Sequence, residues 1–283
     1  MSTKSTELYE IAIASLTKPA VTIIRTKGES AHDTLNHLAD PLRHSYLYKA
    51  ILPEEGKPAS FESYYPLYDI NLDGLSGHVN YLPKTGRLSI WTRLGFPEHD
   101  EGNTEWASSV IKILYTKNVP GVSQIYTFPK KEAEVISFSP YLTLTDTSVL
   151  KHIHNASDSK SPLHNILFTP PDKDGCFHMK SSVESMIDRL TVEKPEQYKL
   201  YGYYEFESFL GGYPDRFGYP KILERILKKL KVEKIAPLIC HYDFPNDNPI
   251  RRDPNRVTQI FTDPTKAAAG DFSSTYYITE IRT

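Results

Sequence analysis

The sequence predicts an α+β protein whose repeated β-α-β-β units place antiparallel sheets around a barrel- or sandwich-like core. Two observations favour this class. Segments of alternating, β-branched or aromatic residues occur along the whole chain, and stripes of apolar residues at helical spacing separate some of them. The order strand, helix, strand, strand also recurs, at Ala20–Ile70, at Arg87–Thr145 and less regularly at Tyr198–Ile281. Helices on one face of such a sheet leave its other face to pack on a second sheet.

Strands are predicted wherever apolar and polar residues alternate, or β-branched and aromatic residues cluster, between turn residues. Lys84, Thr85 and Gly86 are typical of a hairpin turn that would join two of these strands. The predicted strands are Ala20–Thr26, Ser45–Leu52, Phe61–Ile70, His78–Leu82, Arg87–Phe96, Gly121–Phe128, Glu134–Thr145, His164–Thr169, Tyr198–Phe209, Ile235–Phe244, Val257–Phe261 and Ser274–Ile281.

Four helices are predicted from apolar residues at helical spacing and from the residues that precede them. Ser181 and Glu184 form a capping box at the start of a helix that runs to Leu190. Pro220 suits the first turn of a basic, amphipathic helix that includes Lys221–Lys234. The other two helices span Leu35–Leu42 and Thr104–Tyr115.

The recurrent β-α-β-β order suits ferredoxin-like packing, with helices on one face of an antiparallel sheet. The most polar stretch, Asn155–Pro162, lies near the middle of the chain and is the best candidate for a boundary. It divides the chain into an N-terminal part, 1–155, and a C-terminal part, 156–283, which we expect to pack closely together.

One stretch of the chain resembles a known family. Helix Thr104–Tyr115, followed by VPGVSQIYTF (Val119–Phe128) and PYLTLTDTSVL (Pro140–Leu150), resembles tandem dimeric α+β barrel proteins with EthD-like modules. YYEFES (Tyr203–Ser208) resembles the same pattern more weakly. The resemblance implies ferredoxin-like units that pair into a barrel. That family often carries a histidine on its first helix, but Trp106 occupies this region here, so the resemblance implies no catalytic residue.

Composition argues for a globular, cytoplasmic protein. The net charge is −2 and the lysines are scattered, which is not the pattern of a duplex-binding protein. No apolar run approaches the roughly 20 residues of a membrane-spanning helix. The two cysteines, Cys176 and Cys240, lie far apart and favour a reducing compartment. The 19 tyrosines suit half-buried strands, pocket walls and interfaces alike.

No cofactor or metal is predicted. The chain has no P-loop, no strand-linked G-x-G-x-x-G, no CxxC and no HExxH. Asp69–Gly74 copies the first half of a calcium loop, but Asn80 stands where a bidentate glutamate is needed. His152 and His154 would share a face only on a strand, whereas their surroundings favour the end of a helix.

The strongest candidate for chemistry is Cys240-His241-Tyr242-Asp243-Phe244. On a strand, His241 and Asp243 share one face. A carboxylate beside a histidine fixes its tautomer and prepares it for general-base catalysis. We therefore predict His241 as base and Asp243 as the residue that orients it. The alternative is a histidine at a strand end beside a turn aspartate, without any catalytic role.

Further residues are expected to surround this pair. Trp91 and Arg93 share one face of a predicted strand, and His78 lies one hairpin turn away. Tyr203 and Tyr242 lie on strand-like segments close to the candidate pair or within it. These five residues are predicted to bind substrate, although a Trp–Arg face could equally pack against a neighbouring strand.

Three functions are compatible with these patterns. The leading hypothesis is a small-molecule-binding protein, or a cofactor-independent enzyme, with an apolar pocket and the His241–Asp243 pair. A second is a homo-oligomeric assembly protein whose tyrosine-rich strands form an interface. A third is a single-stranded nucleic-acid-associated protein that uses the basic helix Lys221–Lys234. Net charge makes a nucleic-acid partner less expected than a small molecule.

Overall fold

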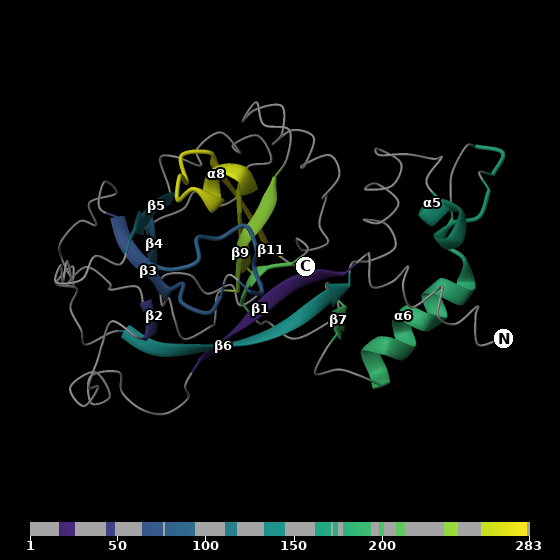
Figure 1. Cartoon of the computed structure of the whole chain (residues 1–283), viewed down its shortest axis with the longest axis horizontal. Coiled ribbons are helices and arrows are strands. Elements are labelled where there is room, and N and C mark those ends of the chain that lie inside the picture. The colour runs from purple at the N-terminus through teal and green to yellow at the C-terminus, as the bar shows by residue number, and fades with distance from the viewer. Residues whose placement is uncertain are drawn as a thin grey trace.

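A computed structural model gives the structure of the protein (Figure 1). The residues that it describes are 17–25, 44–48, 64–75, 77–93, 111–117, 133–144, 162–170, 172–174, 178–193, 198–200, 208–212, 235–242 and 256–281.

Ten strands of this described part follow one another in a single antiparallel sheet, in the order β11-β10-β9-β8-β1-β6-β2-β3-β4-β5. A further short strand, β7, pairs in parallel with β6. The strands are β1 (Lys18–Arg25), β2 (Ser45–Tyr48), β3 (Tyr64–Asn71), β4 (Arg87–Arg93), β5 (Ile111–Thr116), β6 (Ala133–Leu144), β7 (Tyr198–Leu200), β8 (Phe209–Gly211), β9 (Ala236–Tyr242), β10 (Arg256–Thr262) and β11 (Thr275–Ile281).

The sheet curls into a nearly closed barrel. Strands β3 and β9 are five steps apart in the sheet order, which would separate them by about 24 Å in a flat sheet. Yet Tyr68 on β3 and His241 on β9 are joined by a hydrogen bond of 2.7 Å. The inward side chains of the strands, among them Ile23, Ile70 and Ile90, accordingly belong to one buried cluster. The core of the protein is therefore the interior of the barrel.

One end of the barrel is crossed by the connection between β3 and β4, residues 72–86. Its Leu72, Leu75, Val79 and Leu82 are buried in the barrel core. The Tyr81 hydroxyl donates a hydrogen bond to the Pro237 carbonyl of β9, on a distant part of the sheet. Figure 1 shows this trace running from β3 towards β9. The connection thus places apolar side chains in this end of the barrel, while its polar residues, such as His78, stay exposed.

At the same end of the barrel, the two outermost strands of the sheet order, β11 and β5, approach each other; we call this place the seam of the barrel. Helix α8 (Pro264–Ala268) joins β10 to β11, with Asp263 as N-cap accepting from the backbone N–H groups of the first turn. The turn after α8 reaches β5, because a Cβ added to Gly270 would lie 2.4 Å from the Tyr115 ring. The last strand of the sheet order, β5, therefore meets the turn that leads into β11 here, through the Tyr115 ring.

Two helices lie beside β7 at one side of the molecule, away from β3 to β5 (Figure 1). Helix α5 (Pro162–Leu167) precedes an isolated bridge between Phe168 and Met179, and α6 (Ser181–Glu193) follows it. The apolar stripe of α6 is buried, as its helical spacing requires. Its members are Val183, Met186, Ile187 and Leu190. None of the described helices is both long and apolar enough to cross a membrane.

The prediction of an α+β, ferredoxin-like fold is wrong, because the described chain is mostly antiparallel strand and forms a nearly closed barrel. Three element predictions failed with it. The second half of helix Thr104–Tyr115 is strand β5, which pairs with β4. Segment His164–Thr169, predicted as a strand, overlaps helix α5. His78–Leu82 forms turns within the crossing connection and not a hairpin strand.

Most other strand predictions and the helix that begins at Ser181 are confirmed in their described parts. The sequence missed the short helix α8. The predicted elements Leu35–Leu42, Gly121–Phe128 and the helix after Pro220 lie outside the described residues. Strands from both sides of residue 155 pair within the one sheet.

Candidate binding site in the barrel

His241 lies in the wall of the barrel and its side chain is only 5% exposed. Two residues earlier on the same face of β9 is Ile239, which is part of the barrel core. The cross-strand neighbour of His241 on β10 is Thr258. On the other side of β9, Phe209 of β8 pairs with Cys240. Strand alternation therefore turns His241 inward, together with the buried hydroxyl of Thr258.

Two hydroxyl groups contact the same nitrogen of this imidazole. The Tyr68 Oη atom lies 2.7 Å from His241 Nδ1, and the Ser208 Oγ atom lies 3.3 Å from it. The rings of Tyr68 and His241 meet edge to face, with centroids 5.5 Å apart. Ser208 is held by its backbone carbonyl, which accepts from the Ile23 N–H at 2.8 Å. A residue of β3 and the residue just before β8 thus both contact one buried histidine of β9.

The inward face of the barrel wall carries both apolar and charged side chains. Leu47 pairs with Tyr68 in register and also with Glu134 on β6. Glu134 forms an ion pair of 2.7 Å with Arg25, which follows Val21 and Ile23 on the inward face of β1. Both side chains of this pair are mostly buried. The charge of Arg25 is therefore balanced within the wall.

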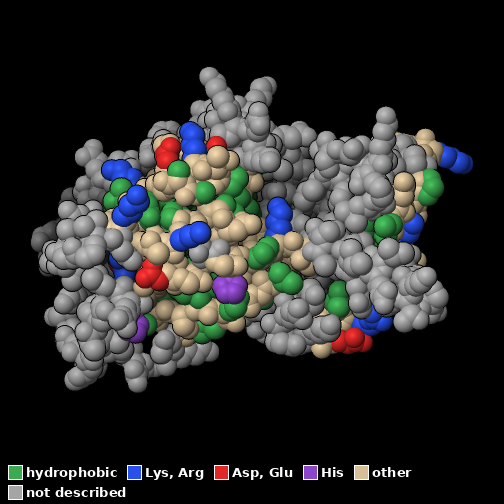
Figure 2. Space-filling view, viewed as in Figure 1, with side chains coloured by type: hydrophobic (Ala, Val, Ile, Leu, Met, Phe, Trp, Pro, Cys, Tyr) green, Lys and Arg blue, Asp and Glu red, His purple; other side chains and the backbone are tan. Residues whose placement is uncertain are grey.

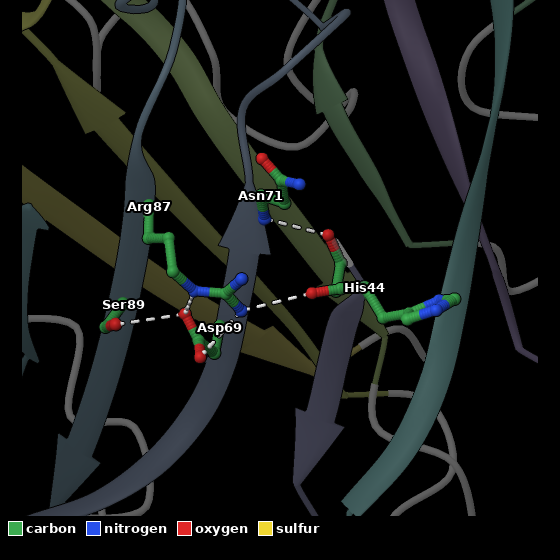
Figure 3. Close-up of polar contacts among 6 residues, drawn as sticks. His44, Asp69, Asn71, Arg87 and Ser89 are labelled. Atoms are coloured by element: carbon green, nitrogen blue, oxygen red, sulfur yellow. Dashed lines mark hydrogen bonds and ion pairs between the residues drawn. The ribbon is translucent and has the colours of Figure 1, made fainter. Parts of the chain in front are cut away.

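A second polar network lies on the other face of the sheet (Figure 3). Arg87 on β4 binds both carboxylate oxygens of Asp69 on β3, through Nε at 3.0 Å and Nη2 at 2.8 Å. It also donates to the His44 carbonyl, and Ser89 donates to Asp69. The network joins the start of β2 to β3 and β4. Asp69 is the first residue of the segment that resembles a calcium loop. Both of its carboxylate oxygens bind Arg87, so they are not available as calcium ligands in this arrangement.

Replacing Arg87 with Met is expected to lower the free energy of unfolding by about 2 kcal/mol, because it removes the charged partner of a mostly buried carboxylate. The matched control is Arg189→Met, which removes an exposed pair with Glu193 at 3.8 Å and should cost about 0.5 kcal/mol or less. Urea denaturation of both variants checks this. Equal losses would show that the Arg87 network adds no more than a surface ion pair.

The residues predicted as a site are not all brought together. Trp91 lies on the face of β4 opposite the core residues Leu88 and Ile90, so it does not share the interior with His241. His78 is exposed on the connection that crosses the other end of the barrel. The backbones of Arg93 and Tyr242 lie at the ends of β4 and β9, and their side chains are outside the description. Asp243 and Tyr203 lie outside the described residues, as do His152 and His154.

Sequence reasoning missed both described partners of His241, Tyr68 and Ser208. The alternation of Tyr68 with Ile70 and Leu72 could have placed Tyr68 on the inward face of its strand. Nothing in the local sequence relates Tyr68 to His241, which is 173 positions away. The contact depends on how far the sheet curls, and this is a property of the whole barrel.

Other ionisable groups lie towards the crossed end. Burial raises the pKa of Tyr81 above its ordinary value, so its hydroxyl stays protonated and donates to Pro237. Burial likewise lowers the pKa of Lys18 at the start of β1. No group of three or more metal-ligating side chains occurs among the residues that the structure describes. The face shown in Figure 2 carries Lys and Arg side chains that are scattered and do not form one large basic patch in its described part.

Comparison with known proteins gives no family for this chain: no protein-family model matches it, and no curated protein matches it significantly. The resemblance to EthD-like modules therefore stays a prediction, while the ferredoxin-like units that it implies are not the fold found. The function has to be argued from the barrel and its buried histidine.

Proposed function

We propose that the barrel binds a small, largely apolar molecule, and that His241, Tyr68 and Ser208 supply its polar contact. The observation that carries this proposal is the hydrogen bond of 2.7 Å between Tyr68 and His241, on the inward face of a largely apolar barrel. Buried polar groups cost stability unless they are hydrogen-bonded, so such a group in a barrel core invites a functional explanation. Binding sites typically combine apolar walls with a few converging polar groups.

The architecture supports the same proposal. The width of a β-barrel grows with its strand number, and eight strands already suffice to hold one small ligand. Ten strands follow one another in this sheet. One end of the barrel is filled by the connection 72–86, which meets β9 at Pro237. His241 lies towards the opposite end of β9, so the proposed ligand lies on the far side of that filling.

If the protein is an enzyme, we propose that His241 acts as the general base on the bound molecule. The predicted orienting residue, Asp243, lies outside the described residues, whereas the Tyr68 phenol contacts His241 Nδ1 directly. Tyr68 can fix the ring orientation of a general base as a carboxylate would, although without its negative charge. We also propose a cytoplasmic location, because two cysteines that lie far apart in the sequence favour a reducing compartment.

Binding of the apolar fluorescent probe N-phenylnaphthylamine tests the proposal. We expect a saturable rise in fluorescence, with binding weakened roughly three- to tenfold by His241→Ala because part of the ligand-facing wall is lost. His78→Ala is the matched control, since His78 is exposed on the crossing connection. Circular dichroism and urea midpoints confirm that both variants fold. Absence of saturable binding, or equal weakening by both substitutions, would count against an interior site.

A further inference from the structure

We propose that the barrel is built from two units that separate from each other at β8 while each unit stays folded. The N-terminal unit contains β1 to β6, and the C-terminal unit contains β9, β10, α8 and β11. In the sheet order, β8 is the strand that links β9 to β1. This motion goes beyond the binding function, and its test needs no ligand.

The ladders on the two sides of β8 are short. In the described sheet, β8 pairs with β1 over Ala20–Thr22 and with β9 at Phe209 and Leu210. By comparison, β1 pairs with β6 along its whole length, Lys18–Arg25, and β10 pairs with β11 along Arg256–Thr262. Parts of a protein that share little backbone pairing open at a lower free energy than its long ladders. Separation at β8 therefore breaks less structure than separation within these long ladders.

The ladder between β2 and β3 is also short, but polar groups reinforce it. Arg87 on β4 donates to the His44 carbonyl just before β2. The Asn71 N–H at the end of β3 donates to the hydroxyl of Ser45 on β2 at 2.8 Å. These bonds tie β2, β3 and β4 into one unit, so the weaker boundary lies at β8.

Two backbone hydrogen bonds mark the boundary between β1 and β8. The Ile23 N–H donates to the Ser208 carbonyl at 2.8 Å, and the Gly212 N–H donates to the Pro19 carbonyl at 3.0 Å. They lie on either side of β8, which ends where Gly211 and Gly212 adopt φ values of +74° and +73°. Both N–H groups lose their acceptors when β1 and β8 separate. Their exchange with solvent hydrogen therefore reports the opening.

Tyrosines of the N-terminal unit hold the C-terminal unit across the barrel. The contacts join Tyr68 to His241, Tyr81 to the Pro237 carbonyl, and the Tyr115 ring to Gly270 in the turn before β11. Contacts of this kind keep the two units closed, and they break when the units move apart. Opening at β8 therefore also separates the two residues of the candidate site, Tyr68 and His241.

Native-state hydrogen exchange at low urea concentrations, followed by NMR, tests the opening in the unmodified protein. We expect the Ile23 and Gly212 amides to exchange at least about tenfold faster than the slowest amides of the β3–β4 and β10–β11 ladders. Their rates should rise with urea, but less steeply, because opening at β8 exposes only part of the buried surface. Rates equal to those of the slowest amides, or rates independent of urea, would overturn the proposal, since they indicate global unfolding or local fraying.

Two variants distinguish opening between the units from unfolding of the whole barrel. Tyr81→Phe removes a contact between the units, so it should accelerate exchange at Ile23 and Gly212 about tenfold, as expected for a lost buried hydrogen bond. Arg87→Met breaks a network inside the N-terminal unit, which stays intact during the opening. It should change these two rates less than about twofold while the slowest β3–β4 amides exchange faster. Equal acceleration by both variants, or none by Tyr81→Phe, would show that the barrel does not open at β8.

Discussion

Gly270→Ala is expected to lower the free energy of unfolding by about 3 kcal/mol. Gly270 has a φ of +81°, in a region that residues with a Cβ adopt at a cost of about 1 to 2 kcal/mol. The added Cβ would also lie 2.4 Å from Cδ1 and 2.6 Å from Cε1 of Tyr115, which is closer than packed atoms can approach. Forcing an additional methyl group into a packed site costs about 1 to 3 kcal/mol. Urea denaturation followed by circular dichroism measures the loss.

Gly74→Ala separates the two contributions. Gly74 has a similar φ of +85°, but a Cβ built there meets nothing within 4 Å. This substitution should therefore cost only the backbone term, about 1 kcal/mol. If the two variants lose the same stability, the contact between the turn after α8 and Tyr115 does not hold the seam of the barrel.

The seam explains why the effect at Gly270 should be large. The Tyr115 ring is packed between Gly270 and Gly86, because a Cβ on Gly86 would lie 2.8 Å from its Cε2 atom. Its hydroxyl donates to the Thr85 carbonyl at 2.9 Å. β5 and β11 form no ladder with each other among the described residues, and the packing of Tyr115 against Gly270 joins β5 to the turn that leads into β11. A displaced Tyr115 would loosen both the end of the connection 72–86 at Gly86 and the turn after α8 at Gly270.

Local signals in the sequence sufficed for some elements. The capping box at Ser181 and Glu184 correctly begins helix α6, because a cap and an amphipathic stripe are both local properties. Alternation likewise located most of the long strands. A strand needs a partner strand to form its hydrogen bonds, however, and the alternation of its own residues does not identify that partner. The fold class was wrong for this reason, since it depended on which distant strands pair.

The segment Thr104–Tyr115 shows the ambiguity directly. The spacing of Trp106, Val110 and Ile113 fits a helix, while Ile111, Ile113 and Tyr115 alternate as in a strand. Pairing with β4 selects the strand from Ile111 onwards, because it satisfies the backbone and turns Ile111 into the core. Short apolar runs of this kind cannot be resolved by their own periodicity.

The candidate site was predictable to a similar degree. His241 was correctly expected on a strand, and its inward direction follows once Ile239 is known to face the core. Its Tyr68 partner was not predictable, because five strand steps separate the two residues along the sheet. Trp91 was expected beside the site, but the alternation of β4 places it on the opposite face from Ile90. The alternation within one strand is enough to predict which face of the sheet a side chain occupies. Which distant side chain it contacts depends on how the whole sheet curls into a barrel.

Leu82→Ala is expected to cost about 3 kcal/mol, although Leu82 lies in a connection without regular structure. Its side chain is only 3% exposed and belongs to the same buried cluster as the strand residues. Removing a buried leucine side chain to Cβ typically costs about 2 to 5 kcal/mol, since it loses apolar burial and leaves a cavity. Loop substitutions are ordinarily mild because loops run over the surface.

Leu114→Ala is the matched control, with the same chemical change at a position inside a regular strand. Leu114 is 42% exposed on β5, so its loss should cost less than about 1 kcal/mol. If the connection 72–86 were a surface loop, the order of the two effects would be reversed, with the strand variant the less stable. Urea midpoints of the two proteins therefore report whether this connection is part of the core. The same result bears on the binding proposal, because that proposal places the ligand on the side of His241, away from the filled end.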